Sequence, residues 1–303
     1  KIPFLVEKEH YFIDKYLKPL SIKSRTFPTG IGDDCAVIDS RERLITSKDI
    51  SVSDVHFPKE LEPYFIAYRS VAIAISDIFA MGGTPTAYLL GITHPKPDDS
   101  WFESFSKGLN DFNEDYDVNL LGGDLTRGEL NISITAFGQA PDNLLTRTGA
   151  NIGDLIFVSD SLGKGKKGLI DYRNNRNSNT NHYLKPKLPT SLMPKLRQLV
   201  TSCIDVSDGL LIDLKRICSL SNVGAIINLS EDIYITDEHD LVAGDDYVLC
   251  FTAREEFKEK ILALDSAIKI IGQIEEGTKV KVLNENNEEI KFKKDGWESF
   301  ESI

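Results

Sequence analysis

The sequence predicts a mixed α/β (α+β) protein with two domains, and three observations support this fold class. Strand and helix patterns alternate within two halves of similar size, as in layered α/β domains. The 303 residues suffice for two hydrophobic cores of ordinary size. The turn-forming run Pro141-Asp142-Asn143 lies between the halves. We therefore expect an N-terminal domain at residues 1–140 and a C-terminal α/β domain at residues 147–303.

Apolar residues in the N-terminal half follow helical or strand spacing. The clearest helix is expected at Glu62–Met81, where small residues suit close packing on a sheet and Gly82-Gly83 ends the helix. The run Gly122-Gly123-Asp124 is expected to form a turn after a buried strand. The other expected elements are a helix at 5–18, strands at Cys35–Ile38 and Leu44–Ile50, an extended segment at Val52–Phe57, a strand at Thr86–Thr93, a helix at Trp101–Phe112, and strands at Val118–Leu121 and Leu130–Phe137.

The same alternation continues in the C-terminal half after a strand at Ile156–Ser159. The run Gly163–Gly168 only superficially resembles a phosphate-binding loop, because it lacks the spacing of that motif. Residues Arg173–Asn181 are rich in Asn and poor in apolar side chains, which predicts an exposed, mobile connection. Further expected elements are helices at Leu192–Val200, Leu210–Leu220 and Glu255–Leu264, and strands at Cys203–Asp205, Gly224–Leu229, Tyr247–Thr252, Ile268–Ile274 and Lys279–Leu283.

The composition excludes several classes of protein. A net charge of −12 argues against a nucleic-acid-binding surface. No apolar run approaches the roughly 20 residues of a membrane-spanning helix, so no membrane partner is expected. The four cysteines show no Cys-x-x-Cys spacing and the five histidines do not cluster, which disfavours a thiolate zinc site and a disulfide framework. A cytoplasmic location fits this use of cysteine.

Aspartates beside glycine or small residues recur at the ends of the expected elements. In the stretch Gly30-Ile-Gly-Asp-Asp-Cys-Ala36, the adjacent Asp33 and Asp34 cannot both face the core, since strand neighbours point to opposite faces. Two carboxylates about 4 Å apart repel by roughly 4 kcal/mol at an effective dielectric near 20. Convergence of several would therefore need protonation or divalent cations such as magnesium, as in metal-assisted phosphoryl transfer. The recurring residues are Asp34, Asp49, Asp77, Asp124, Asp205 and Asp208.

A simpler interpretation is that these residues are separate turn and helix-capping acids. It is favoured for any single aspartate, and particularly for Asp208, which can cap the helix that follows it. The positions of the set alone do not decide between the two interpretations.

Six motifs in a fixed order favour the shared site. Together they resemble the thiamine-monophosphate kinase family, which belongs to the aminoimidazole-ribonucleotide-synthetase-like superfamily. The resemblance runs from about residue 3 to Phe300, and its specificity lies in the order of the motifs. They are Gly30-Ile-Gly-Asp-Asp-Cys-Ala36, Asp49 with His56-Phe57, Ser76-Asp77-Ile-x-Ala-Met-Gly-Gly83, Gly122-Gly-Asp-Leu-Thr-Arg-Gly128, Thr146-Arg147-Thr-Gly149 and Asp205-Val-Ser-Asp-Gly-Leu210.

The resemblance implies ATP-dependent phosphorylation of thiamine monophosphate to thiamine diphosphate, by direct in-line transfer with several magnesium ions. It also implies an aminoimidazole-ribonucleotide-synthetase-like fold and a homodimer that pairs N-terminal sheets. The N-terminal domain would bind metal and ATP, and the C-terminal domain would complete the nucleotide and substrate site. The implied magnesium ligands are Asp34, Ser47, Asp49, Asp77, Asp124, Asp205 and Asp208. The implied ATP contacts are Gly123, Asp124, Arg147 and Ser207, and the implied thiamine-phosphate contacts are His56, Asp245 and Trp297.

Two positions depart from the family pattern. Lys48 stands where a small hydroxyl residue is usual, and it could contact phosphate or point away from the metal cluster. Asp245 replaces the usual Glu of Gly-Glu-Asp-Tyr, which shortens the substrate-facing acid by one methylene. Considered without the resemblance, His56 could be a satisfied strand histidine and Trp297 a core residue of a C-terminal tail.

Two other functional interpretations remain. One is another enzyme of the superfamily, such as selenophosphate synthetase or aminoimidazole ribonucleotide synthetase. The former needs a reactive Cys or selenocysteine in an N-terminal Gly-rich loop, and Cys35 instead leads into an apolar run. The other is a non-catalytic protein that binds ATP or thiamine phosphate, which the departures at Lys48 and Asp245 motivate.

Overall fold

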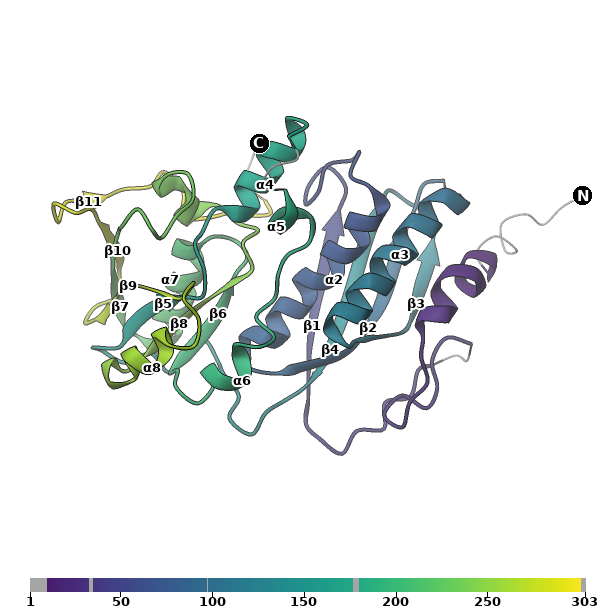
Figure 1. The fold of residues 1–303 in the computed structure, drawn as a ribbon, viewed down its shortest axis with the longest axis horizontal. Coiled ribbons are helices and arrows are strands. Elements are labelled where there is room, and N and C mark those ends of the chain that lie inside the picture. The colour runs from purple at the N-terminus through teal and green to yellow at the C-terminus, as the bar shows by residue number, and fades with distance from the viewer. Residues whose placement is uncertain (1–9, 33–34, 97, 177–179, 301–303) are drawn as a thin grey trace, which may run out of the picture. The chain divides into compact units, whose positions relative to one another are not determined.

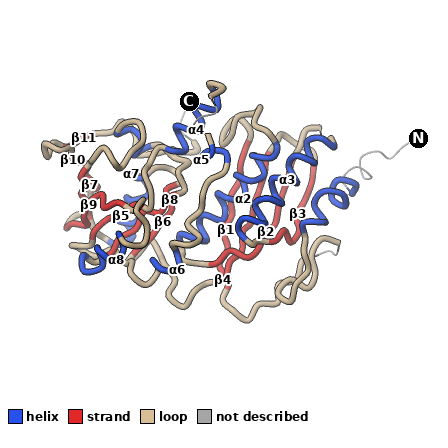
Figure 2. The backbone as a smooth tube through the Cα atoms, viewed as in Figure 1, coloured by secondary structure: helices blue, strands red, loops and turns tan. Residues whose placement is uncertain are grey.

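A computed structural model of the chain describes residues 10–32, 35–96, 98–176 and 180–300. These residues form helices and strands in the expected mixed α/β arrangement (Figure 2). The chain folds into two compact units. Unit 1 comprises Lys1–Ile78 and Gly83–Pro141, and unit 2 comprises Phe79–Gly82 and Asp142–Ile303. Within the described residues, no helix is long and apolar enough to cross a membrane.

Unit 1 is built on a four-stranded sheet with the strand order β1-β4-β2-β3. Strands β1 and β2 pair antiparallel with β4, and β3 runs parallel to β2. The elements are β1 (Leu44–Val52), α2 (Pro63–Ala80), β2 (Thr84–Thr93), α3 (Asp99–Tyr116), β3 (Asn119–Thr126) and β4 (Asn131–Gln139), preceded by a π-helical turn at Ile13–Leu17 and a 3-10 turn at Lys18–Leu20.

Helices α2 and α3 lie side by side along one face of this sheet (Figure 1). The hydroxyls of Tyr64 and Tyr68 on α2 donate hydrogen bonds to α3, at 2.6 Å from Asp111 and 2.8 Å from Asp115. Helix α3 begins at a true N-cap, because the Asp98 side chain accepts from the backbone N–H of Trp101 at 2.9 Å. Four large apolar side chains on one stripe of α3 are buried, as its amphipathic pattern predicts. They are Phe102, Phe105, Leu109 and Phe112.

The opposite face of the sheet in unit 1 is only partly covered. A small cluster forms where Phe27, Ala36 and Ile38 pack with side chains of β2, β3 and β4, among them Phe137. Farther along, Ile50 on the edge strand β1 is 48% exposed. The sheet therefore has one face buried under helices and another that is largely open within the unit.

Unit 2 contains a seven-stranded sheet with the order β11-β10-β7-β9-β5-β8-β6. Helix α7 packs on it through Leu210, Leu214 and Ile217, which are completely buried. The elements are β5 (Leu155–Val158), α4 (Lys164–Arg173), α5 (Asn181–Leu184), α6 (Met193–Leu196), β6 (Ser202–Val206), α7 (Leu210–Ser221), β7 (Gly224–Asn228), a 3-10 turn (Glu238–Val242), β8 (Val248–Ala253), a 3-10 turn (Glu255–Phe257), α8 (Lys258–Leu262), β9 (Lys269–Glu275), β10 (Val280–Leu283) and β11 (Glu289–Ile290).

The expected turn at Gly122–Asp124 was wrong, because these residues continue strand β3. Gly123 has a φ of 154°, and a Cβ atom there would lie 1.7 Å from the carbonyl oxygen of Leu90 on β2. The β2–β3 register shifts between Tyr88 and Leu89. Glycine thus permits the close approach that an irregular parallel pair needs, and it does not mark the end of the strand here.

The strand expected at Cys35–Ile38 and the extended segment expected at Val52–Phe57 were also wrong. The segment Cys35–Ile38 contains only an isolated bridge from Val37 to Thr29. The segment Val52–Phe57 turns back on itself, since the backbone N–H of His56 donates to the carbonyl of Val52 at 2.9 Å. Both segments are short, and short segments carry little information about strand pairing.

Two expected helices differ in form. The helix expected over Leu192–Val200 is reduced to the single turn Met193–Leu196. The helix expected at 5–18 is helical from residue 10 onward among the described residues, and it tightens into the π and 3-10 turns. Pro19 removes a backbone donor near that end and restricts the residue before it, which favours the change of helix type.

Candidate functional site

Strand β1 and helix α2 bring Ser47 and Asp77 together in unit 1. The Ser47 hydroxyl donates a hydrogen bond to Oδ2 of Asp77. Asp77 lies in the last turn of α2, where the helix dipole disfavours a carboxylate, and the hydroxyl donor partly offsets this cost. Asp49 is two residues beyond Ser47 on β1, so its side chain projects from the same face of the strand. Three of the predicted metal ligands therefore share one side of the sheet.

Lys48 projects from the other face of β1. Its Nζ donates a hydrogen bond to the Ser133 hydroxyl on β4. The sequence left open whether this lysine would enter the carboxylate cluster or point away, and the structure shows that it points away from Ser47 and Asp77. Its ammonium group therefore does not occupy the position that a cation would take beside those two residues.

Asp124 does not join that group within unit 1. The register places Asp124 beside Gly91 on β2, whereas Asp49 lies beside Ile134 on β4. Strand β3 is at the opposite edge of the sheet from β1. The Asp124 side chain is exposed, whereas the next residue, Leu125, is buried.

A cavity of about 940 Å³ in unit 1 connects two of the glycine-rich motifs. Gly30 and Gly32 line it together with Gly123 and Asp124. Its volume is within the usual range for sites that bind small molecules. Asp33 and Asp34 lie outside the described residues, but their neighbour Cys35 also lines this cavity. The first motif and the predicted nucleotide-contacting motif thus face a common space.

His56 lies in the turn after β1 and is half-buried. Its Nδ1 accepts a hydrogen bond from the backbone N–H of Val52 at 3.0 Å. In a neutral ring the proton is then on Nε2, which could donate to a phosphate oxygen. The alternative interpretation placed His56 in a strand with its hydrogen bonds satisfied. The structure places it in a turn, and its ring has a backbone partner.

In unit 2 the loop Ser207–Gly209 is hydrogen-bonded to two segments that are distant from it in the sequence. The backbone N–H of Asp245 donates to the carbonyl of Ser207 at 2.9 Å, and that of Trp297 donates to the carbonyl of Asp208 at 2.9 Å. Asp205 is at the end of β6, two residues before the loop, and is buried. The structure therefore brings together Asp205, Ser207, Asp208, Asp245 and Trp297 as predicted site residues of unit 2.

Arg147 lies near the same strand with an exposed side chain. The carbonyl of its neighbour Thr146 accepts from the backbone N–H of Cys203 on β6 at 2.9 Å. Cys203 is two residues before Asp205 on that strand. Arg147 is therefore anchored through the main chain to the strand that carries Asp205.

Asp208 does not cap helix α7, so the capping interpretation of this residue was wrong. The N-cap is Gly209, and no side chain caps the helix there. The Asp208 carboxylate instead accepts a hydrogen bond from Arg216 at 2.7 Å. Asp213 accepts from the loop amides in place of a cap. Sequence reasoning missed Asp213 and Arg216, although an aspartate among the buried leucines of an amphipathic helix was a usable signal.

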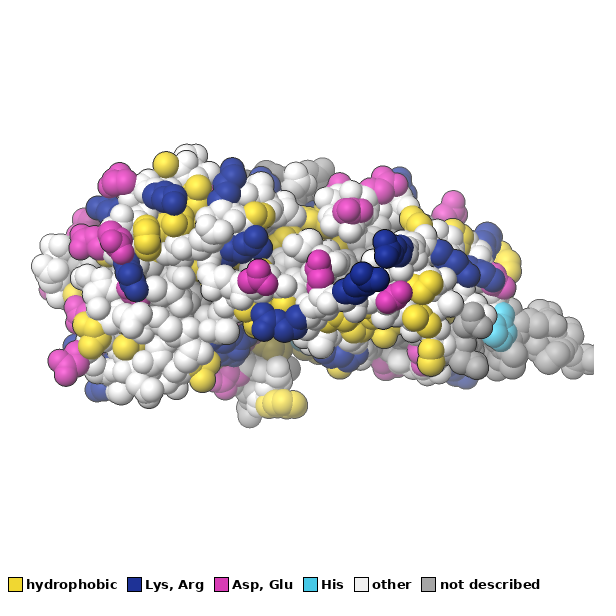
Figure 3. Space-filling model, turned by 90° about the horizontal axis from the view of Figure 1, so that it is seen from below, with side chains coloured by type: hydrophobic (Ala, Val, Ile, Leu, Met, Phe, Trp, Pro, Cys, Tyr) yellow, Lys and Arg dark blue, Asp and Glu magenta, His cyan; other side chains and the backbone are white. Residues whose placement is uncertain are grey.

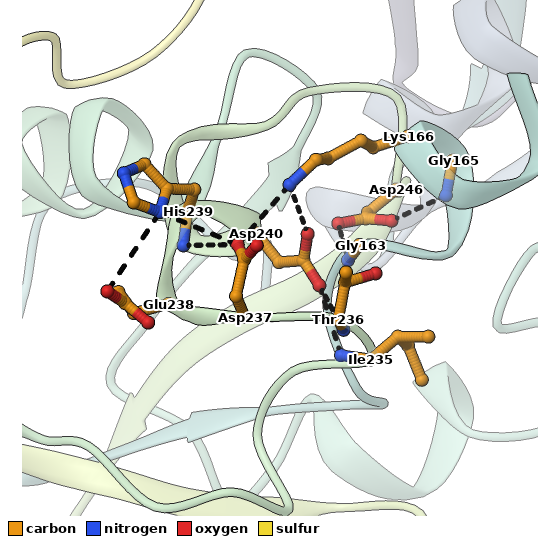
Figure 4. A network of polar contacts seen from close by, with 10 residues as sticks. All are labelled: Gly163, Gly165, Lys166, Ile235, Thr236, Asp237, Glu238, His239, Asp240 and Asp246. Carbon is orange, nitrogen blue, oxygen red and sulfur yellow. Dashed lines mark hydrogen bonds and ion pairs between the residues drawn. The ribbon is translucent and has the colours of Figure 1, made fainter. Parts of the chain in front are cut away.

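A second polar network holds the segment around Asp245 (Figure 4). The fully buried Asp246 carboxylate accepts from the backbone N–H groups of Gly163 at 2.7 Å and Gly165 at 2.9 Å. Burial raises the pKa of Asp246 to about 7, although these two hydrogen bonds act against the rise. The start of α4, which superficially resembled a phosphate loop, therefore binds a carboxylate of the chain itself.

The same network holds residues 245–247 in an uncommon backbone conformation. Asp245 and Tyr247 on either side of Asp246 have φ values of 71° and 50°. A residue other than glycine adopts such a φ value at a cost of about 1–3 kcal/mol, and the conformation persists only where the surrounding structure enforces it. Lys166 of α4 also pairs with the buried Asp240 at 2.8 Å. Strain beside a predicted substrate contact is consistent with a functional site.

The described residues contain no group of three or more His, Cys, Asp or Glu side chains that could hold a metal ion. The predicted ligands are distributed between the two units. Figure 3 shows acidic and basic side chains interspersed over the face it displays. That face carries no large basic patch of the kind that binds nucleic acid.

Comparison with known proteins identifies relatives along nearly the whole chain. The family model for the N-terminal domain of AIR synthase related proteins matches residues 32–140. The chain is 36% identical to thiamine-monophosphate kinase of Buchnera aphidicola subsp. Schizaphis graminum, over 96% of the chain and 98% of that protein. It is 35% identical to the thiamine-monophosphate kinase of Escherichia coli K12, over 82% of the chain and 83% of that protein.

Solved structures show the same fold. Thiamine-monophosphate kinase from Stenotrophomonas maltophilia K279a aligns with a TM-score of 0.78 at 31% identity, covering 92% of this chain and 96% of that one. AaThiL complexed with AMPPCP and TMP aligns with a TM-score of 0.76 at 26% identity, covering 99% of both chains. The Escherichia coli hydrogenase maturation protein HypE, at 16% identity and a TM-score of 0.74, shares the fold alone; the alignment covers 95% of both chains.

Proposed function

The chain belongs to the thiamine-monophosphate kinase family, and we propose on this basis that it transfers the γ-phosphate of ATP to thiamine monophosphate. The products are thiamine diphosphate and ADP. The observation that carries the proposal is the 36% identity to a thiamine-monophosphate kinase over 98% of that protein's length. The ATP analogue and TMP bound by AaThiL support the same pair of substrates.

We propose a direct in-line transfer, in which a phosphate oxygen of thiamine monophosphate attacks the γ-phosphorus of ATP. Catalysis of this kind depends on positioning and on stabilising charge, and it needs no phosphoenzyme. Gly123, Asp124, Arg147 and Ser207 are the proposed ATP contacts. The exposed guanidinium of Arg147 offers a planar fork to phosphate oxygens.

His56, Asp245 and Trp297 are the proposed contacts for thiamine monophosphate. The Trp297 side chain is 41% exposed, so its ring has a face from which it can stack on a cationic heterocycle. Asp245 is fixed by backbone hydrogen bonding to Ser207. The shorter acid at this position therefore works from a segment whose backbone is firmly held.

The donor atoms suit magnesium, which prefers hard oxygen ligands. Ser47 and Asp77 already lie together, and Lys48 points away from them. When bound, magnesium would supply positive charge between the phosphate oxygens of ATP. The proposed ligands are Asp34, Ser47, Asp49, Asp77, Asp124, Asp205 and Asp208.

We further propose a homodimer and a cytoplasmic location. The partly open sheet face of unit 1 supports the dimer, since Ile50 and Leu44 on β1 are exposed there. A second copy of the same sheet could cover those side chains, as an isologous interface requires. The cytoplasmic location agrees with the four free cysteines.

Incubation with ATP, magnesium and thiamine monophosphate tests the activity directly. Thiamine diphosphate and ADP should form in equal amounts, measured by chromatography. Absence of both products would contradict the proposed function. Tight calorimetric binding of thiamine monophosphate and an ATP analogue without turnover would instead support the binding-protein alternative that Asp245 and Lys48 motivated.

A further inference from the structure

One buried carboxylate, that of Asp213, binds the backbone of the loop Ser207–Gly209. Oδ2 of Asp213 accepts hydrogen bonds from the backbone N–H groups of Ser207, Asp208 and Gly209, each at 3.2 Å. Asp213 is completely buried on α7, between Leu210 and Leu214. Three successive amides that point to a single oxygen leave the loop little freedom, because any displacement of it would break several bonds together.

Arg216 extends this anchor to a side chain of the loop. Its Nη1 donates to Oδ1 of Asp213 at 2.5 Å, and its Nη2 donates to Oδ2 of Asp208 at 2.7 Å. The planar guanidinium therefore bridges two carboxylates, which a lysine cannot do with the same geometry. The bridge fixes one oxygen of Asp208 and leaves Oδ1 as the oxygen available to another partner.

The anchored loop supports further residues of the proposed site. Asp245 and Trp297 both hydrogen-bond to its carbonyl groups at 2.9 Å. A Cβ atom at Gly244 would lie 2.5 Å from the carbonyl oxygen of Ser207, so the two segments pack in direct contact. A movement of the loop would thus be transmitted to the proposed substrate contacts.

The stability of the fold alone does not require a buried carboxylate at this position. Burying a carboxylate is unfavourable unless it is fully hydrogen-bonded, and apolar residues in place of a buried ion pair are often as stable or more so. The neighbouring positions on the buried face of α7 are leucines, so an apolar side chain would be compatible with this helix.

We propose that Asp213 and Arg216 are positioning residues for phosphoryl transfer. Asp213 sets the backbone of the loop that carries Ser207, and Arg216 sets the direction of the Asp208 carboxylate. Neither residue contacts the reacting atoms, and both act through the loop. The proposal rests on the proposed function, because Ser207 and Asp208 are assigned there to ATP and magnesium.

The test compares Asp213→Asn and Arg216→Lys with wild type in the full-length chain. We expect each variant to lower kcat by about 10- to 100-fold, as loss of groups that orient ligands usually does. We also expect a higher magnesium concentration for half-maximal rate. Arg216→Lys keeps the positive charge but loses the two-pronged bridge, so it separates orientation from net charge.

Asp154→Asn provides the matched control. Asp154 is also a buried carboxylate of unit 2, and it accepts from the Asn151 N–H at 2.9 Å and the Thr201 hydroxyl at 2.7 Å. Within the part of the chain that the structure describes, Asp154 hydrogen-bonds to Asn151, Thr201 and Ile274 and not to the 207–209 loop. We expect this variant to lose thermal stability but to keep the wild-type kcat and magnesium requirement, measured where circular dichroism shows all proteins folded.

A binding measurement separates this inference from the proposed activity. Calorimetry with magnesium and a non-hydrolysable ATP analogue needs no turnover, and we expect about tenfold weaker binding in Asp213→Asn than in wild type. Wild-type affinity and kcat in both loop variants would overturn the positioning role. An equal loss in Asp154→Asn would also overturn it, since the effect would then be a general consequence of instability. Absence of product from the wild type would count against the proposed function alone.

Discussion

Asp77 is a carboxylate in a position where its own helix disfavours it. It occupies the last turn of α2, and the Ser47 hydroxyl donates to it from β1. A helix end solvated by water alone would not account for this hydroxyl partner. An electrostatically unfavourable group that is kept beside a second oxygen donor suits a cation site.

Replacement of Asp77 by Asn should lower kcat by about 100-fold and raise the magnesium requirement, because one charged oxygen ligand is lost. Steady-state assays over a range of magnesium concentrations would measure both. Asp111→Asn is the control, since Asp111 on α3 accepts from Tyr64 at the start of α2, away from Asp77, and its loss should cost about 1 kcal/mol of stability without changing kcat. Normal kinetics in Asp77→Asn would remove this residue from the metal site.

Asp246 should make the stability of the protein depend on pH. Its pKa is raised from the ordinary 3.8 to about 7 in the folded protein, mainly by burial. Between about pH 4 and pH 7 the folded state therefore holds a proton that the unfolded state lacks. The free energy of unfolding should fall as pH rises through this window, by up to about 1.4 kcal/mol per pH unit from this group.

Urea denaturation of wild type and Asp246→Asn at pH 5, 6 and 7 would measure this contribution. The variant is expected to be less stable overall, because an amide offers one acceptor oxygen to the two N–H groups of Gly163 and Gly165. Its stability should nevertheless fall less steeply with pH than that of wild type. Parallel slopes in the two proteins would show that Asp246 is ionised in the fold at pH 5.

At the level of elements, β3 shows how a glycine pair can belong to a strand. Gly122 and Gly123 were expected in a turn, yet the strand passes through them and through Asp124 and ends at Thr126. Periodicity and composition identified α2, α3 and most strands, because long amphipathic segments carry a strong signal. They did not identify this passage, since the reason for Gly123 is the position of Leu90 on another strand.

Gly123→Ala should destabilise the protein by about 3 kcal/mol, because the added Cβ would meet the Leu90 carbonyl oxygen at 1.7 Å. Gly122→Ala is a matched control in the adjacent position. A Cβ atom at Gly122 would lie 3.6 Å from Cδ2 of Leu89, which is an ordinary contact. Thermal denaturation of both variants would reveal the difference, and similar melting temperatures would contradict the close β2–β3 approach.

For the whole molecule, the partly open sheet face of unit 1 is the feature that bears on assembly. Ile50 and Leu44 are exposed on β1, and Phe137 on β4 is only partly buried. Exposed apolar side chains on a sheet face often mark an interface. The proposed homodimer would cover them.

Ile50→Glu should convert the dimer to a monomer, because it places a charge within the proposed apolar contact. Sedimentation velocity at several protein concentrations would measure the change. Leu220→Glu is the control, since Leu220 is 53% exposed on α7 and belongs to unit 2 and not to the sheet of unit 1, so its substitution should leave the assembly intact. A wild-type monomer, or a dimer that survives Ile50→Glu, would exclude this face as the interface.

The sequence by itself determined the mixed α/β class, the order of most elements and the family, because these depend on local periodicity and on motifs that are contiguous in the chain. It also predicted Asp205, Ser207, Asp208, Asp245 and Trp297 as site residues, and the structure gathers them around one loop. Only the tertiary structure decided that Lys48 points away from Asp77 and that Asp213 anchors the loop. The direction of Lys48 depends on pairing with a strand about 85 residues away. Asp213 acts through the positions of three backbone N–H groups in the folded loop, which cannot be read from the spacing of residues in the sequence.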